Sequence, residues 1–201
     1  MALISEKPKN YKADIQSEVK TRTRQRILAA CRDLFLERWA DQITLEDIAR
    51  QANVTVQTIL RHFGTRDALV NLAISEMDLG IKMRKVPQQQ GNLQTITSAV
   101  AEFYEVYGLY LLRAIAQEDR FPQLNMLLTR SRRMHHEWVQ LSFEVYLRAL
   151  SPQNRQQLED QLYSLTEVYF WRVYRIDLGK SREILENTWV RMLRSLLQSY
   201  R

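Results

Sequence analysis

The chain has 201 residues, a net charge of +6, a pI near 9.5, and 45% apolar against 26% charged residues, the composition of a soluble globular protein with one or two domains. Five glycines and four prolines disfavour a strand-rich fold with its many turns and favour long helices. One cysteine excludes an intrachain disulfide, and no apolar run approaches the ~18 residues of a membrane span. The first residues are too polar for a signal peptide, so we expect a soluble, cytoplasmic protein.

The positive charge is concentrated near the N-terminus. Residues 1–66 contain 12 lysines and arginines against 8 aspartates and glutamates, whereas residues 67–201 contain 17 against 15. This excess favours a polyanionic partner there, although a solvated basic surface would give the same count.

The first predicted elements are an arm and a helix. Residues 1–16 are polar and lack helical periodicity, so we expect a mobile arm. Apolar residues then recur at helical spacing over about 18–39. Cys31 lies on this apolar stripe, which favours a buried structural cysteine.

The stretch 44–63, TLEDIARQANVTVQTILRHF, predicts two short helices joined by a tight turn. Thr44 resembles the start of a capping box with Asp47, and Thr55 precedes the second helix. The stripe that the second helix is expected to bury consists of Val56, Ile59, Leu60 and Phe63. Gly64 ends that helix, and a further helix is predicted over 66–81.

The segment 82–92 is the predicted domain boundary, because a proline, a glycine and three glutamines interrupt the helical pattern there. Further helices are predicted over about 92–117, 123–150, 152–176 and 181–200. The expected fold is therefore all-α, with about nine helices divided among an arm (1–16), an N-terminal domain (17–81) and a C-terminal helical domain (82–201).

The face of the helix after Thr55 that points away from the apolar stripe carries Gln57, Thr58, Arg61 and His62. Glutamine can pair with adenine and arginine with guanine, and a short helix supported by another helix fits the major groove. The alternative is a helical corner with an ordinary polar surface, which the pattern alone does not exclude.

Residues 22–72 resemble the DNA-binding domain of TetR-like transcriptional regulators. The resemblance is carried by RTRQRILAACRDLFLE, TLEDIARQANV and TVQTILRHFGTRDALV. It implies an N-terminal three-helix helix-turn-helix domain and a helical C-terminal half that dimerises and binds effectors.

Four positions depart from the family pattern. Asn53 replaces the usual turn glycine, and asparagine tolerates the left-handed conformation better than other residues do. Leu60 replaces an aromatic residue that often contacts phosphate in the family, and leucine cannot make that contact. Arg66 replaces a lysine and keeps its charge, while Val56 offers only an apolar contact.

The predicted DNA-binding residues are Thr44, Thr55, Val56, Gln57, Thr58, Arg61, His62 and Arg66. Within this set, the threonines that begin the two helices are assigned to phosphate, together with His62 and Arg66. Gln57, Thr58 and Arg61 are assigned to base edges. Arg22 and Arg24 could add charge from the start of the first helix.

The C-terminal half carries the predicted dimer and effector surfaces. Dimerisation is predicted through Leu158, Leu162, Leu165, Tyr169, Thr188, Trp189, Met192 and Leu196, although burial within the monomer is the alternative. An apolar or aromatic effector is predicted to contact Phe103, Tyr107, Trp138, Tyr146, Tyr169 and Tyr174, although aromatic residues at helical spacing also build ordinary cores.

No metal or cofactor is expected. His135 and His136 are adjacent, so on a helix their side chains point about 100° apart and cannot bind one ion.

No arrangement of residues typical of an enzyme's catalytic site is present in the sequence. The resemblance to TetR-like regulators implies a homodimeric repressor released from a palindromic operator in double-stranded DNA by a small-molecule ligand. The alternatives are a DNA-binding factor without such a ligand, or a helical module for protein interaction.

Overall fold

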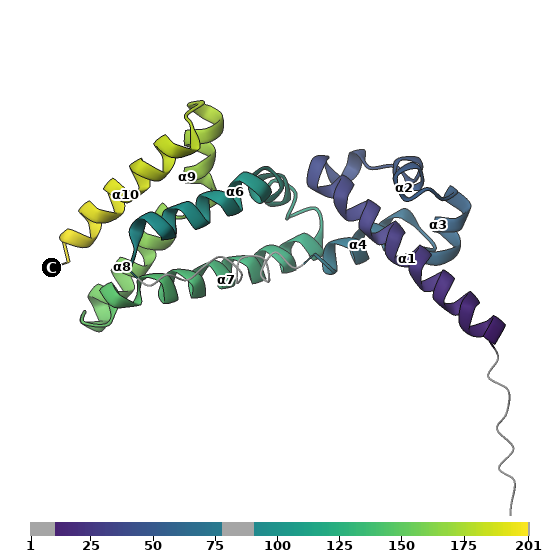
Figure 1. Ribbon diagram of the computed structural model, residues 1–201, viewed down its shortest axis with the longest axis horizontal. Coiled ribbons are helices and arrows are strands. Elements are labelled where there is room, and N and C mark those ends of the chain that lie inside the picture. The colour runs from purple at the N-terminus through teal and green to yellow at the C-terminus, as the bar shows by residue number, and fades with distance from the viewer. Residues whose placement is uncertain (1–10, 78–90, 201) are drawn as a thin grey trace, which may run out of the picture. The chain divides into compact units, whose positions relative to one another are not determined.

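The computed structural model describes residues 11–77 and 91–200, with the backbone alone for residues 11–14, and every regular element in this part of the chain is a helix (Figure 1). The prediction of an all-α fold is therefore confirmed. The chain forms two compact units, Met1–Ala73 and Ile74–Arg201. Of the predicted boundary at 82–92, residues 82–90 lie outside the described residues.

The N-terminal unit consists of α1 (Tyr11–Glu37), the short 3₁₀ turn η1 (Ala40–Gln42), α2 (Leu45–Ala52), α3 (Val56–Phe63) and most of α4 (Arg66–Ser75). Its core is built from apolar side chains of every helix: Ile27, Leu28, Leu34, Phe35, Ile48, Ile59, Leu69 and Val70. Cys31 belongs to this core, as predicted, and burial raises the pKa of its thiol to about 12.

The N-terminal helix begins earlier than expected. The described part of the predicted arm, from Tyr11 onward, is already helical and continues into α1. Ile15 and Val19 are exposed there, so this first part of α1 is not held by core packing. The predicted helix over 66–81 ends at Ser75, and its last residues lie outside the described part.

The turn between α2 and α3 depends on a left-handed residue. Asn53 has φ 50° and ψ 55°, and among the described residues it is the one non-glycine with positive φ. Its N–H group and that of Val54 donate to carbonyls of the last turn of α2. The expectation that asparagine would serve in place of glycine is therefore confirmed.

The loop before α2 is held by the first residue of α4. Arg66 donates from Nε to the carbonyl oxygen of Ile43 at 2.6 Å and from Nη2 to that of Ala40. A guanidinium can satisfy two backbone oxygens at once because its N–H groups form a rigid fork. Arg66 therefore fixes η1 and the start of α2.

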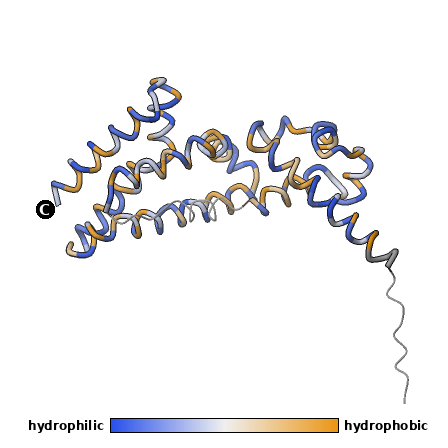
Figure 2. The backbone as a smooth tube through the Cα atoms, viewed as in Figure 1, coloured by the Kyte–Doolittle hydropathy of each residue, from blue (hydrophilic) through white to orange (hydrophobic). Residues whose placement is uncertain are grey.

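The C-terminal unit contains α6 (Leu93–Ile115), α7 (Pro122–Leu147), α8 (Pro152–Leu165), α9 (Val168–Arg172), the π-helical segment η2 (Val173–Asp177) and α10 (Arg182–Gln198). Asn92, Ser151 and Ser181 cap α6, α8 and α10 through their side chains. Orange and blue alternate along these helices in Figure 2, as expected for amphipathic helices. Within the described ranges, no helix has the length and apolar character needed to cross a membrane.

The single helix predicted over 152–176 is wrong, because the structure breaks it after Leu165. Thr166 is fully buried, and its hydroxyl contacts the carbonyl oxygen of Leu162 at 2.9 Å and Nε2 of His135 at the same distance. Glu167 then starts α9 by accepting from the N–H group of Val168. α8 therefore ends at a buried polar contact with α7. Helical periodicity in the sequence cannot predict this contact.

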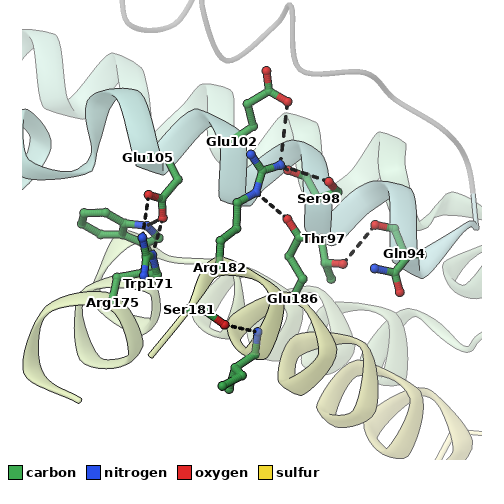
Figure 3. Close-up of polar contacts among 11 residues, drawn as sticks. Gln94, Thr97, Ser98, Glu102, Glu105, Trp171, Arg175, Ser181, Arg182 and Glu186 are labelled. Atoms are coloured by element: carbon green, nitrogen blue, oxygen red, sulfur yellow. Dashed lines mark hydrogen bonds and ion pairs between the residues drawn. The ribbon is translucent and has the colours of Figure 1, made fainter. Parts of the chain in front are cut away.

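The packing of α6 against α9 leaves no room for a side chain at Gly108. A Cβ there would lie 2.5–2.8 Å from ring atoms of Trp171. The indole is fixed by a 2.9 Å hydrogen bond from its Nε1 to Glu105, which also accepts from Arg175 at 2.6 Å (Figure 3). The hydrogen bonds from Arg175 hold the pKa of Glu105 below its usual range, against the opposing effect of burial.

Gly108→Ala is expected to destabilise the protein by roughly 1–3 kcal/mol, because the methyl group overpacks the indole of Trp171. In most helix interiors the same change stabilises by about 0.5–1 kcal/mol, so the sign is diagnostic. Urea unfolding measures the difference. In a Trp171→Leu background the penalty should largely disappear, and an unchanged penalty there would show that the indole is not its cause.

Arg66→Lys is expected to destabilise the N-terminal unit by roughly 1–3 kcal/mol, because lysine keeps the charge but cannot hold both carbonyl oxygens. Arg61→Lys is the matched control, since Arg61 is exposed on α3. Thermal unfolding followed by circular dichroism compares the two variants. Equal stability of both would mean that the fork of Arg66 contributes nothing to the fold.

Candidate nucleic-acid interface

Thr44, the residue before α2, caps the start of that helix. The Thr44 hydroxyl accepts from the N–H group of Asp47 at 3.1 Å and contacts Oδ2 of the same residue at 2.9 Å. Hydrogen bonds from Thr44 lower the pKa of Asp47, and Arg38 and Arg50 pair with its carboxylate at 3.3 and 3.2 Å. Thr44 thus stabilises the start of α2, and the adjacent carboxylate is neutralised by two arginines.

Thr55, the residue before α3, caps the start of that helix in the same way. Oγ1 of Thr55 accepts from the N–H group of Thr58 at 3.1 Å, and the two hydroxyl oxygens lie 2.9 Å apart. Thr58 is half-buried, while Thr55 is exposed. The structure therefore makes Thr58 part of the cap of α3, although the sequence assigned it to base edges.

The exposed side chains of α3 are Gln57, Leu60 and Arg61. Ile59 is fully buried and Val56 is half-buried, so the polar pair 57 and 61 lies opposite the core, as predicted. The expectation that Leu60 is buried is wrong, because 40% of its surface is exposed. Successive residues of a helix are rotated by about 100°, so Leu60 lies about 100° from the buried Ile59, on the side toward Gln57. A helical wheel centred on Ile59 predicts this exposure.

The last turn of α3 lies in a positive electrostatic environment. His62 is half-buried, and its pKa is lowered by burial and by the charges of Arg61, Lys20 and Arg24. The guanidinium of Arg24 lies 5.0 Å from the ring centroid of Phe63. Basic side chains of α1 and α3 therefore converge at this end of α3, which favours an anion such as phosphate.

The other basic residues singled out by the sequence differ in placement. Arg22 is exposed on α1 and pairs with Glu18 at 3.4 Å. Arg66 is directed to backbone carbonyls and also pairs with Asp67 at 3.0 Å, so the structure does not bring it to the exposed face of α3. Arg26, which the sequence did not single out, contacts the carbonyl oxygen of Asn53 at 3.5 Å.

The six aromatic residues predicted to bind a ligand do not come together. Phe103 and Tyr107 are neighbours, with ring centroids 5.2 Å apart. The remaining four have separate environments: Trp138 is buried beside His135, Tyr146 donates to the Gly91 carbonyl oxygen, Tyr169 is exposed and Tyr174 stacks on Phe170. The prediction of one aromatic-lined site is therefore not supported by their arrangement.

A small cavity of about 40 Å³ lies beside Phe103 in the C-terminal unit. Leu111, Ile115, Leu128 and Val168 provide apolar walls, while Ser131, Arg132, His135 and Glu167 provide polar groups. Nδ1 of His135 lies 3.2 Å from Oε1 of Glu167. Burial alone would raise the pKa of Glu167, but hydrogen bonds from His135 and Tyr163 and the charge of His135 lower it. Within the described residues, no group of three or more His, Cys, Asp or Glu side chains could hold a metal ion.

Half of the predicted dimerisation residues belong instead to the core of the protomer. Leu158, Leu162, Thr188 and Trp189 are buried, because the apolar stripes of α8 and α10 pack within the C-terminal unit. Leu165 and Leu196 are half-buried, and Tyr169 and Met192 are exposed. The spacing of apolar residues identified amphipathic helices but not which neighbour covers them.

Comparison with known proteins agrees with this geometry. Residues 27–73 match the family described as bacterial regulatory proteins, tetR family. The chain is 31% identical over 109 residues to the HTH-type transcriptional repressor Rv3405c of Mycobacterium tuberculosis, covering 51% of this chain and 55% of that protein. The chain spans about half the length of the curated relatives that it matches. These relatives are named as transcriptional regulators, in agreement with the prediction that the chain is not an enzyme.

Solved structures share the fold. A tetR-family transcriptional regulator from Streptomyces coelicolor aligns with a TM-score of 0.69 at 17% identity, covering 90% of this chain and 84% of that one. Salmonella enterica GusR aligns with a TM-score of 0.61 at 18% identity, covering 88% and 96%. The matched residues 27–73 contain α2, the turn at Asn53 and α3. Residues 27–73 therefore carry the helix-turn-helix domain of the tetR family of bacterial regulatory proteins, and this domain lies in the N-terminal unit.

Proposed function

We propose that this protein is a sequence-specific DNA-binding transcriptional regulator, acting as a homodimeric repressor on a palindromic operator. The N-terminal unit binds DNA, and the C-terminal unit dimerises and receives the regulatory input. The observation that carries this proposal is the outer face of α3, where Gln57 and Arg61 are exposed one turn apart on a helix anchored by Ile59. These are the side chains that pair bidentately with adenine and guanine in the major groove.

The surroundings of α3 supply the sequence-independent part of binding. Lys20 and Arg24 from α1 act on the same end of α3 as Arg61, and the positive field that they create attracts phosphates. His62 faces phosphate as a neutral donor in this proposal, because burial and the neighbouring cations lower its pKa. Thr44 and Thr55 position backbone N–H groups at two helix starts, where phosphate is also favoured.

Dimerisation uses one group of the apolar side chains that the protomer leaves exposed. They lie on α9, η2, the residue that follows η2, and α10, and comprise Tyr169, Val173, Ile176, Leu178, Ile184 and Met192. Exposed apolar side chains grouped on elements that follow one another in the chain favour a protein interface. A two-fold dimer would also pair two copies of α3 with the two halves of a palindrome, which raises affinity beyond that of one short helix.

The regulatory input is the less constrained part of the proposal. A small-molecule effector would enter the cavity beside Phe103, with Tyr107 nearby, and weaken operator binding. The present volume of about 40 Å³ is far below the roughly 300–1,000 Å³ of typical ligand pockets, so such an effector must enlarge it. A more open pocket of about 770 Å³ borders Tyr146 and Arg194 in the same unit, so the small cavity beside Phe103 is not the one place where an effector could bind. The second candidate function is a DNA-binding regulator without a small-molecule ligand.

Arg61→Ala is expected to weaken binding to the selected operator by roughly 1–3 kcal/mol, because a bidentate contact to a base is lost. The operator is first obtained by selecting bound fragments from random DNA. Fluorescence anisotropy at fixed salt then compares the variant with Arg191→Ala, which removes an equal charge from an exposed site on α10. Equal weakening on operator and random DNA would reassign Arg61 to phosphate. Failure of the wild-type protein to bind any DNA at low salt would instead favour a protein-interaction module.

Met192→Glu is expected to convert the dimer to a monomer of 23.9 kDa, because the variant places a carboxylate in the apolar interface. Sedimentation velocity measures the mass. Met126→Glu on α7 is the matched control, since Met126 is also exposed, and it should leave the dimer intact. A dimer that persists in the Met192 variant would move the interface to another surface.

A further inference from the structure

Leu60 is an unexpected member of the exposed face of α3. Every residue of α3 is described, and the three classed as exposed are Gln57, Leu60 and Arg61. Two of them are polar and suit base edges, whereas 40% of the leucine is exposed without an obvious structural benefit. The helix around it is regular, because the Leu60 carbonyl oxygen accepts from the N–H group of Gly64 at 2.8 Å.

Val56 and Leu60 form an apolar strip beside the polar strip of Gln57 and Arg61. Residues four apart are neighbours on a helix surface, so Val56 and Leu60 lie one above the other, as do Gln57 and Arg61. Val56 is half-buried and Leu60 is exposed, so the apolar strip runs from the edge of the core onto the outer face. The face of α3 therefore combines two kinds of chemistry side by side.

The major groove presents one apolar group on its base edges, the C5-methyl group of thymine. A helix whose polar strip pairs with donors and acceptors brings the adjacent apolar strip to the same groove. Burying one methyl-sized group against leucine would strengthen binding roughly fourfold at the usual value per CH₂. A docked protein would need a broader apolar surface than one leucine flanked by glutamine and arginine.

We propose that Leu60 reads thymine through its C5-methyl group, and that each operator half-site carries a thymine facing the strip of Val56 and Leu60. This inference rests on the proposed DNA-binding function. The resemblance to the family implies only that Leu60 has lost a phosphate contact. The inference gives Leu60 a role in base specificity as well.

The test uses the full-length protein and its selected operator. Each thymine is replaced in turn by deoxyuridine, which lacks only the 5-methyl group, and the dissociation constant is measured for wild type and Leu60→Ala. We expect one position in each half-site at which deoxyuridine weakens wild-type binding roughly fourfold and does not affect the variant. Leu60→Met keeps an apolar side chain and should retain the sensitivity. Leu141→Ala, at an exposed leucine of α7, should behave as wild type.

Two results would overturn the inference. Wild-type binding could be insensitive to deoxyuridine at every position, or Leu60→Ala could keep the full sensitivity. In both cases the protein still selects an operator, so the proposed function stands while the role of Leu60 falls. If no DNA is selected, the proposed function fails and the inference fails with it.

Discussion

The burial of Ile59 is the constraint on which the interface depends. α3 has only eight residues and one fully buried side chain, so the direction of that side chain fixes the direction of all the others. The two ends of α3 keep the helix in this orientation. Thr55 caps its start, Asn53 turns the chain before it in the left-handed conformation, and Gly64 ends it. Because these contacts involve backbone groups, the outer face can vary in sequence without loss of the fold.

In the N-terminal unit, the residues that stabilise the candidate nucleic-acid interface are different from the residues that are exposed on its surface. Arg66, Arg26 and the threonines before α2 and α3 contact the unit's own backbone or caps, whereas Gln57, Leu60 and Arg61 are exposed. Lys20 and Arg24 occupy an intermediate position, because they come from α1 but act electrostatically on the end of α3. Under the proposed function, DNA affinity and base specificity would therefore depend on different residues of one small unit.

The C-terminal unit uses polar contacts to arrange its apolar helices. Thr166 and Glu167 contact His135 and separate α8 from α9, and Glu105 holds both the indole of Trp171 and the guanidinium of Arg175. Thr166 and His135 are buried, and buried polar groups are costly unless they are paired, so their contact permits few alternative arrangements of α7, α8 and α9. The exposed apolar side chains on α9, η2 and α10 follow from this arrangement, and they are the surface on which the proposed dimer depends.

The sequence by itself determined the elements that local rules govern. Composition predicted an all-helical chain, capping residues located the starts of α2, α3, α8 and α10, and the tolerance of asparagine for positive φ preserved the turn at Asn53. Only the tertiary structure decided which side of each amphipathic helix was covered, and by which neighbour. It buried Trp189 in the protomer, exposed Leu60, directed Arg66 to carbonyl oxygens and broke the helix predicted over 152–176. The physical reason is that periodicity records an apolar direction on one helix, whereas burial and pairing depend on partners distant in sequence.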